Sequence, residues 1–146
     1  MTSTKCDFCD SKTDQAQEIM RGEYIKIFHP RRILTENQLL FMPIRHVEHV
    51  HDLSEQEVKE LFELLKKINI NFKDKYKMVG YNFFVNTGTK AGQHIPHVHF
   101  HFFPRYEDEE VSPLEKLNNP RKHKIEKLTE KEMKESVENI KINLNL

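Results

Sequence analysis

The chain has 146 residues, 37% hydrophobic and 32% charged, and 23 basic and 23 acidic side chains give a formal net charge of 0. A neutral chain argues against nucleic-acid binding by bulk charge, and no apolar run approaches the roughly 18–20 residues that span a bilayer. Two cysteines, and a start without the apolar stretch of a secretory signal, predict a cytoplasmic protein rather than a disulfide framework.

The first predicted elements are two strands at 24–28 and 39–42, apolar runs that are bounded by Pro30 and Pro43. A long helix follows, because Ser54 begins a Ser-x-x-Glu capping pattern. One face of this helix is expected to be buried, since its apolar side chains recur at helical spacing: Val58, Leu61, Phe62, Leu65, Ile68 and Phe72.

Two more strands are predicted after the helix, at 79–85 and 95–103, with a turn-rich loop at 86–92. The charged stretch 107–127 is interpreted as a surface excursion. A last helix is expected from Thr129, and its apolar stripe could pack on the sheet or on a partner subunit. Strands before and after a helix predict an α+β fold with a mainly antiparallel sheet, one long helix and a C-terminal helix.

The segment 97–103 alternates between histidine and apolar residues in its centre. Alternate side chains of a strand share a face, so His97, His99 and His101 would form a row with neighbours roughly 6.5–7 Å apart. Imidazoles transfer protons, attack electrophiles and bind metals, and the alternation is consistent with all three.

This pattern resembles the signature of the histidine triad family of nucleotide hydrolases and transferases. The resemblance extends upstream to the loop at 86–96 and the segment 42–46, and downstream to 103–105. Cys6-x-x-Cys9 is similar to the opening of the bacterial zinc-binding branch, which resembles diadenosine polyphosphate hydrolases. The resemblance covers about 6–105, so we expect a single domain over 1–146 in which 106–146 adds a charged loop and the C-terminal helix.

The resemblance implies that His99 attacks the α-phosphorus of a nucleoside phosphate and forms a covalent nucleotidyl-histidine that water resolves. It also implies that the phosphate is bound by His101, the Asn86 side chain and backbone N–H groups around Gly92 and Gln93. His94 stands where many members carry Ser or Thr near the leaving group. Its imidazole could donate a proton to that group, or it could be a bulkier tolerated residue.

A structural zinc site is also implied by the resemblance. Cys6 and Cys9 alone are a weak zinc signal, which leaves a redox pair or a lost site open. Zinc-binding members complete the set with two histidines whose positions here are His46 and His97, and His49 is the rival for His46. A Cys₂His₂ set is closed, so the zinc would be structural and would remove His97 from proton chemistry.

The match weakens in the segment 27–37, where family members usually carry an acidic residue that holds the ribose hydroxyls. No aspartate stands there, and Glu36 is the available substitute. This departure motivates an alternative, a zinc-stabilised nucleotide-binding or regulatory module with little catalysis. On analogy with the family we expect a homodimer, a nucleotide substrate, and neither a nucleic-acid nor a membrane partner.

Overall fold

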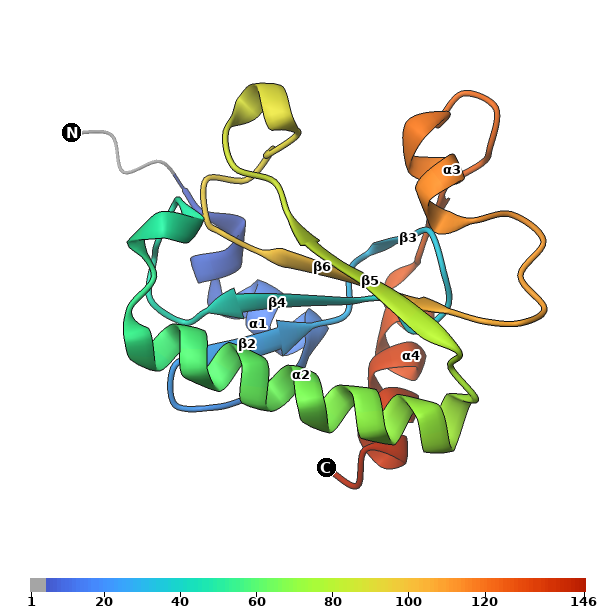
Figure 1. The fold of residues 1–146 in the computed structure, drawn as a ribbon, viewed down its shortest axis with the longest axis horizontal. Helices are drawn as coiled ribbons and strands as arrows, with labels where there is room; N and C mark the ends of the chain where they lie inside the picture. Colours follow the sequence, from blue (N-terminus) through green and yellow to red (C-terminus); the bar gives the residue numbers. More distant parts are fainter. Residues whose placement is uncertain (1–4) are drawn as a thin grey trace.

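A five-stranded antiparallel sheet lies at the centre of the molecule, with the strand order β1-β2-β4-β6-β5 (Figure 1). The computed structural model describes residues 5–146; residues 1–4, part of the start considered for a secretory signal, lie outside the described residues. The predicted mainly antiparallel sheet is confirmed. Its strands are β1 Glu18–Arg21, β2 Ile25–Phe28, β4 Leu39–Pro43, β5 Gly80–Val85 and β6 Phe100–Arg105.

Two helices share the main core with this sheet, the long α2 (Glu55–Tyr76) and the C-terminal α4 (Glu130–Asn143). Shorter elements complete the chain. They are η1 Asp7–Cys9, α1 Ser11–Gln17, η2 Val50–Asp52, η3 Thr89–Ala91, α3 Pro113–Asn118, and a two-stranded sheet of β3 Arg32–Ile33 and β7 Glu126–Lys127. None of the helices in the described part of the chain has the length and apolar character that crossing a membrane requires.

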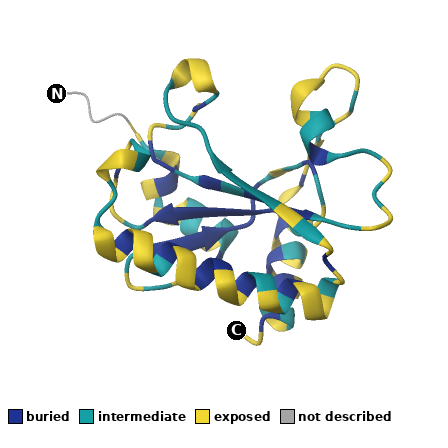
Figure 2. Ribbon diagram, in the orientation of Figure 1, coloured by how far each residue is buried: buried dark blue, intermediate teal, exposed yellow. Residues whose placement is uncertain are grey.

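The central strands are buried on both faces (Figure 2). Ile27, Phe41 and Phe102 belong to the main core, which they share with α2 and α4. A second, smaller core lies around Phe8, Phe28, Leu40 and Met42. It forms because the amino-terminal segment covers the neighbouring side chains of β2 and β4, which alternate with those of the main core.

The start of α2 confirms the capping prediction, since the Ser54 hydroxyl accepts a hydrogen bond of 3.1 Å from the Glu57 N–H. The predicted buried face is only partly right. Val58 and Phe62 are 40% and 52% exposed, and Leu64 is buried instead. Phe62 follows Leu61 by one residue, about 100° around the helix, so the stripe continues past the core onto an open flank.

The predicted strand 95–103 begins only at Phe100. Pro96 has no N–H to donate to a ladder, and the Val98 N–H bonds to the Val47 carbonyl, 2.7 Å away, in a loop outside the sheet. Apolar side chains still face the core in this irregular stretch, as predicted, since Val98 is 1% exposed. The predicted row of three histidines on one regular strand was therefore wrong in its backbone, although the apolar side chains between them face the core.

The carboxy-terminal part is more ordered than predicted. The stretch 107–127 is not only a surface loop, because it contains α3 and the strand β7, which pairs with β3. The stripe of α4 packs on the chain's own core rather than on a partner subunit, with Met133, Val137 and Ile140 each less than a tenth exposed.

Candidate active site and metal centre

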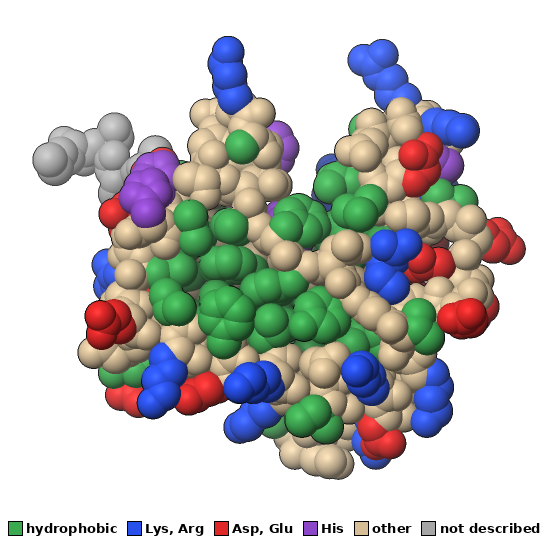
Figure 3. Space-filling model, in the orientation of Figure 1, with side chains coloured by type: hydrophobic (Ala, Val, Ile, Leu, Met, Phe, Trp, Pro, Cys, Tyr) green, Lys and Arg blue, Asp and Glu red, His purple; other side chains and the backbone are tan. Residues whose placement is uncertain are grey.

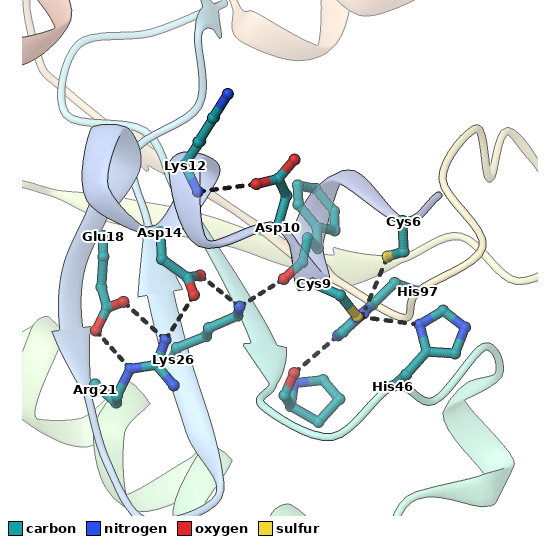
Figure 4. A network of polar contacts seen from close by, with 12 residues as sticks. Cys6, Cys9, Asp10, Lys12, Asp14, Glu18, Arg21, Lys26, His46 and His97 are labelled. Atoms are coloured by element: carbon teal, nitrogen blue, oxygen red, sulfur yellow. Dashed lines mark hydrogen bonds and ion pairs between the residues drawn. The ribbon is translucent and has the colours of Figure 1, made fainter. Parts of the chain in front are cut away.

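Two cysteines and two histidines from three distant segments converge beside the sheet (Figure 4). Cys6 Sγ and Cys9 Sγ each lie 3.5 Å from His97 Nδ1, and Cys9 Sγ lies 3.4 Å from His46 Nδ1. All four ligand atoms lie within 4.8 Å of one another. Tetrahedral zinc with ordinary Zn–S and Zn–N bonds separates sulfur from nitrogen by about 3.6 Å, so this donor set fits a zinc ion.

The backbone explains why these side chains meet. His46 follows β4 and His97 precedes β6, and β4 and β6 are neighbours in the sheet. The His97 Nε2–H donates to the Pro43 carbonyl oxygen, 2.8 Å away, which leaves Nδ1 facing the sulfur atoms. His49, the rival third ligand, is not in the cluster; its ring stacks on His51 with centroids 5.3 Å apart.

Proton affinities in the cluster follow from burial. Desolvation lowers the pKa of His97 to about 4, so its imidazole is neutral, as a metal ligand must be. Burial, with the neighbouring Cys6 as the next cause, raises the pKa of the Cys9 thiol to about 11. A metal ion binds the thiolate, so metal binding at this cluster releases protons.

His99 is oriented by a backbone hydrogen bond. Its Nδ1 lies 2.8 Å from the His97 carbonyl oxygen. A carbonyl oxygen only accepts, so Nδ1 carries the proton and Nε2 keeps its lone pair. Burial lowers the pKa of His99, which keeps the imidazole neutral at pH 7, and the ring of Phe8 packs edge-on against it at 5.1 Å.

His101 stands next to His99 and lies on β6, and the two ring centroids are 5.0 Å apart. His101 stacks on Phe84 of the edge strand with centroids 4.9 Å apart. Burial lowers the pKa of His101 to about 4, so the ring is neutral and has one N–H to donate.

The loop at 86–94 carries the remaining predicted contacts. Both polar atoms of the Gln93 side chain are already hydrogen-bonded within the protein: the oxygen accepts from the Gly88 N–H at 2.8 Å, and the nitrogen donates to the Glu48 carbonyl at 2.8 Å. Gly92 has a φ of 101°, and a side chain there would lie 3.4 Å from Asn86 Nδ2. His94 is exposed on this loop, and its charge contributes to lowering the pKa of His99.

The described segment 27–37, where family members usually carry a ribose-binding acidic residue, places no acidic side chain next to His99. His29 is 2% exposed and its Nδ1 lies 2.8 Å from the Gln38 carbonyl. The Glu36 carbonyl accepts a hydrogen bond from the Tyr106 hydroxyl at 3.0 Å. Tyr106 follows the last residue of β6 whereas His99 precedes its first, so Glu36 and His99 lie at opposite ends of this strand. Sequence reasoning missed Phe8 as a wall of the site; its place between the two cysteines is the available signal.

The comparison with known families decides the assignment. A model of the HIT domain matches residues 12–108. This chain belongs to the HIT family. The HIT match leaves out Cys6 and Cys9 before it and α4 after it, so two of the four residues that could hold a metal ion lie outside the matched segment.

Relatives of this HIT protein come from bacteria, archaea and yeast. It is 29% identical to the protein hit of Bacillus subtilis over 103 residues, 69% of this chain and 71% of the relative. It is 31% identical to an uncharacterized HIT-like protein of Methanocaldococcus jannaschii over 124 residues, 78% of this chain and 90% of the relative. Identity to a bis(5'-adenosyl)-triphosphatase of Saccharomyces cerevisiae is 33% over 99 residues, 67% of this chain and 48% of that enzyme.

Solved structures share the fold of this HIT protein. A Zn-bound histidine triad family protein from Mycobacterium smegmatis superposes with a TM-score of 0.74 at 20% identity, covering 98% of this chain and 95% of the other. The diadenosine triphosphate hydrolase of Plasmodium falciparum superposes with a TM-score of 0.71 at 20% identity, covering 90% and 78%. At these identities the likeness establishes the HIT fold.

Proposed function

We propose that this HIT protein is a nucleotide hydrolase or nucleotidyl transferase that cleaves at the α-phosphate through a covalent nucleotidyl-histidine on His99. The observation that carries the proposal is the hydrogen bond from His99 Nδ1–H to the His97 carbonyl, which leaves the Nε2 lone pair on a neutral imidazole. The relationship to a bis(5'-adenosyl)-triphosphatase supports dinucleoside polyphosphates as substrates, and nucleoside phosphoramidates suit the same chemistry.

The reaction has two displacements at phosphorus. In the first, His99 Nε2 forms a bond to the α-phosphorus, the bond to the leaving oxygen or nitrogen breaks, and His94 gives that atom a proton. In the second, water attacks the same phosphorus, the N–P bond breaks, and His94 takes a proton from the water. His99 returns to its starting state, and a nucleoside monophosphate is released.

Negative charge on the non-bridging oxygens requires donors around the phosphate. The His101 N–H and the Asn86 amide supply them, whereas the expected backbone donors are already bonded, the Gly92 N–H to the Thr89 carbonyl and the Gln93 N–H to the Gly88 carbonyl at 3.1 Å each. The neutral ring of His101 donates one hydrogen bond without adding a charge that would repel a protonated neighbour. The Gln93 side chain acts indirectly, by holding the loop through Gly88 and Glu48.

We also propose that a structural zinc is bound by Cys6, Cys9, His46 and His97. The zinc would link the amino-terminal segment to the sheet and would take no part in catalysis, since four protein donors leave no position open for substrate. Metal analysis should find one zinc per chain, lost in His46→Ala and retained in His49→Ala, because only His46 lies in the cluster. Zinc retained in both variants would contradict this ligand set. The expected cytoplasmic location suits this site, because zinc binding requires reduced thiols.

A homodimer is the proposed assembly. β5 is an edge strand, and apolar side chains are exposed on it and on the flank of α2, at Val58, Phe62 and Tyr81. Figure 3 shows hydrophobic side chains gathered over these two elements. A second copy would cover them and would pair with the free edge of β5.

The alternative function is a zinc-stabilised nucleotide-binding or regulatory module with little catalysis. It is favoured by one observation, the absence of an acidic side chain beside His99 in the described segment 27–37: His29 is bonded to Gln38, and Glu36 lies by Tyr106. A weak hold on the ribose hydroxyls would slow positioning of the α-phosphate without removing the nucleophile.

The deciding experiment compares wild type, His99→Ala and the control His51→Ala, which alters an exposed histidine. Adenosine phosphoramidate and diadenosine polyphosphates are the substrates, and release of nucleoside monophosphate is measured. We expect His99→Ala to lose at least about a thousandfold in kcat while circular dichroism shows the fold retained, and His51→Ala to match wild type. Turnover by His99→Ala refutes the mechanism. Nucleotide binding without turnover in wild type favours the module.

A further inference from the structure

Lys26 is a buried cation in the middle of β2. It is 2% exposed, and its ammonium donates to the Phe8 carbonyl at 2.5 Å and to Asp14 Oδ1 at 2.6 Å (Figure 4). The same ammonium lies 4.8 Å from the centre of the Phe28 ring. Lysine is among the residues least often fully buried, and its burial is tolerated when the charge is paired and hydrogen-bonded.

The two polar partners of Lys26 lie on either side of Cys9 in the sequence. Phe8 precedes this cysteine within η1, and Asp14 follows it in α1. Asp14 is also bound by Arg21 of β1 at 3.1 Å, and Arg21 is paired with Glu18 at 2.8 Å. One ammonium therefore joins η1, α1 and the sheet immediately next to the metal cluster.

Phe8 connects this network to the proposed nucleophile. Its carbonyl is held by Lys26, and its ring packs edge-on against His99 at 5.1 Å and against His97 at 5.9 Å. The Phe8–Cys9 peptide is held at both of its polar atoms: its N–H donates to the Cys6 carbonyl at 3.0 Å, and its carbonyl accepts from Lys26 at 2.5 Å. The bond from Lys26 ties this turn to β2 and so helps to fix the direction of the Phe8 side chain.

We propose that Lys26 is a positioning residue for the reaction at His99: it holds the Phe8 carbonyl, and the Phe8 ring holds the His99 imidazole with Nε2 toward the α-phosphorus. The inference rests on the proposed function. Lys26 has no access to substrate because it is 2% exposed, so it acts only through Phe8. The His97 carbonyl restrains one side of the His99 ring and Phe8 restrains its face. Small misplacements of a reacting group cost large factors in rate.

The test uses the 146-residue chain loaded with zinc. Lys26→Met keeps the length of the side chain and removes its donors, and Asp14 retains Arg21 as a partner. The matched control is Lys12→Met, which changes an exposed lysine of α1. We expect Lys26→Met to lose at least tenfold in kcat with KM within about threefold and one zinc per chain, while Lys12→Met matches wild type.

A double-mutant cycle with Phe8→Leu separates positioning from general stability. If Lys26 acts through Phe8, the double variant loses no more kcat than the worse single variant, because residues in one pathway are not additive. Multiplicative losses would overturn the proposal, as would a kcat of folded, zinc-loaded Lys26→Met within twofold of wild type. Should Lys26→Met fail to fold, Asp14→Asn weakens the same network from its partly exposed side, and the same criteria apply.

A spectroscopic measurement distinguishes failure of the inference from failure of the proposed function. Proton NMR of the aromatic and imidazole rings, at one pH without substrate, reports whether the Phe8 ring contacts the His99 imidazole. We expect equal Phe8–His99 nuclear Overhauser effects in wild type and Lys12→Met, and weaker ones in Lys26→Met, because Lys26 acts through Phe8. If no protein turns over any nucleotide, the proposed function fails. Identical Phe8–His99 effects in wild type and Lys26→Met overturn the positioning role whatever the activity.

Discussion

His101 is kept neutral by its surroundings. Burial, followed by the neighbouring His99, lowers its pKa to about 4, whereas a free histidine titrates near 6.5. Between these two pH values the unfolded chain binds a proton at this residue and the folded chain does not. The free energy of unfolding therefore has its full contribution from His101 above about pH 6.5 and loses it as the pH falls toward 4.

This linkage can be measured by urea unfolding at pH 7 and pH 4.5. We expect the His101 contribution to fall by roughly 2 kcal/mol between these two pH values. His101→Gln has no titrating group at this position, so its loss of stability over the same interval should be smaller by that amount. Histidines that do not contact residue 101 have the same surroundings in both proteins, so their contributions cancel in the comparison. Equal pH dependence in the two proteins would show that His101 is not held neutral.

At the scale of elements, one side chain joins the long helix to the β1–β2 turn. The Glu60 carboxylate of α2 accepts hydrogen bonds from three successive backbone N–H groups, those of Glu23 at 2.9 Å and of Tyr24 and Ile25 at 2.6 Å each. A side chain at Gly22 would begin 2.5 Å from Glu60 Oε1. Glycine leaves room for the carboxylate here, and a larger residue would have to displace the Glu60 side chain.

Removing this charge should destabilise the fold. We expect Glu60→Gln to lower the free energy of unfolding by about 1–3 kcal/mol, because charge-assisted hydrogen bonds become weaker and one donor faces an amide N–H. Glu63→Gln is the control: this residue lies one turn along the helix, and its only ion pair among the described residues is with exposed Lys59 at 4.0 Å. Equal unfolding midpoints for the two variants in urea would refute the role of Glu60.

The elements that the sequence predicted well are those with a strong local signal. Ser54 marks the start of α2, and the apolar runs at 25–28 and 39–43 are strands. The helix α1 could not be predicted from periodicity because it has no buried residue, and its position follows from Lys26 and α4. β7 has two exposed residues, and only its pairing with β3 makes it a strand.

For the site, the residue types were predictable and the geometry was not. The ligand set came from the resemblance, because spacing alone did not distinguish His46 from His49; the fold places only His46 against Cys9. The tautomer of His99 depends on the carbonyl of His97, which the alternating pattern does not reveal. Lys26 appeared as an ordinary member of a strand, since its partners lie 18 and 12 residues away.

For the whole molecule, the exposed apolar flank of α2 predicts how two copies meet. Phe62 is 52% exposed on this flank, and Ile142 is 69% exposed on α4. We expect light scattering after gel filtration to give a dimer for wild type and for Ile142→Glu, and a monomer for Phe62→Glu. The introduced glutamate would be buried in the dimer interface without a partner in Phe62→Glu, but not in Ile142→Glu. A monomeric wild type, or a dimeric Phe62→Glu, would contradict this interface.

The metal cluster also has a consequence for synthesis. Cys6 and His97 are 91 residues apart. At about 5–20 residues per second, the ribosome makes His97 roughly 5–18 s after Cys6. Throughout that interval the nascent chain carries two thiols without their fourth ligand. A chain that stops before residue 97 lacks one of the four donors of the proposed zinc site, so we expect metal loading to distinguish it from a chain that contains all four.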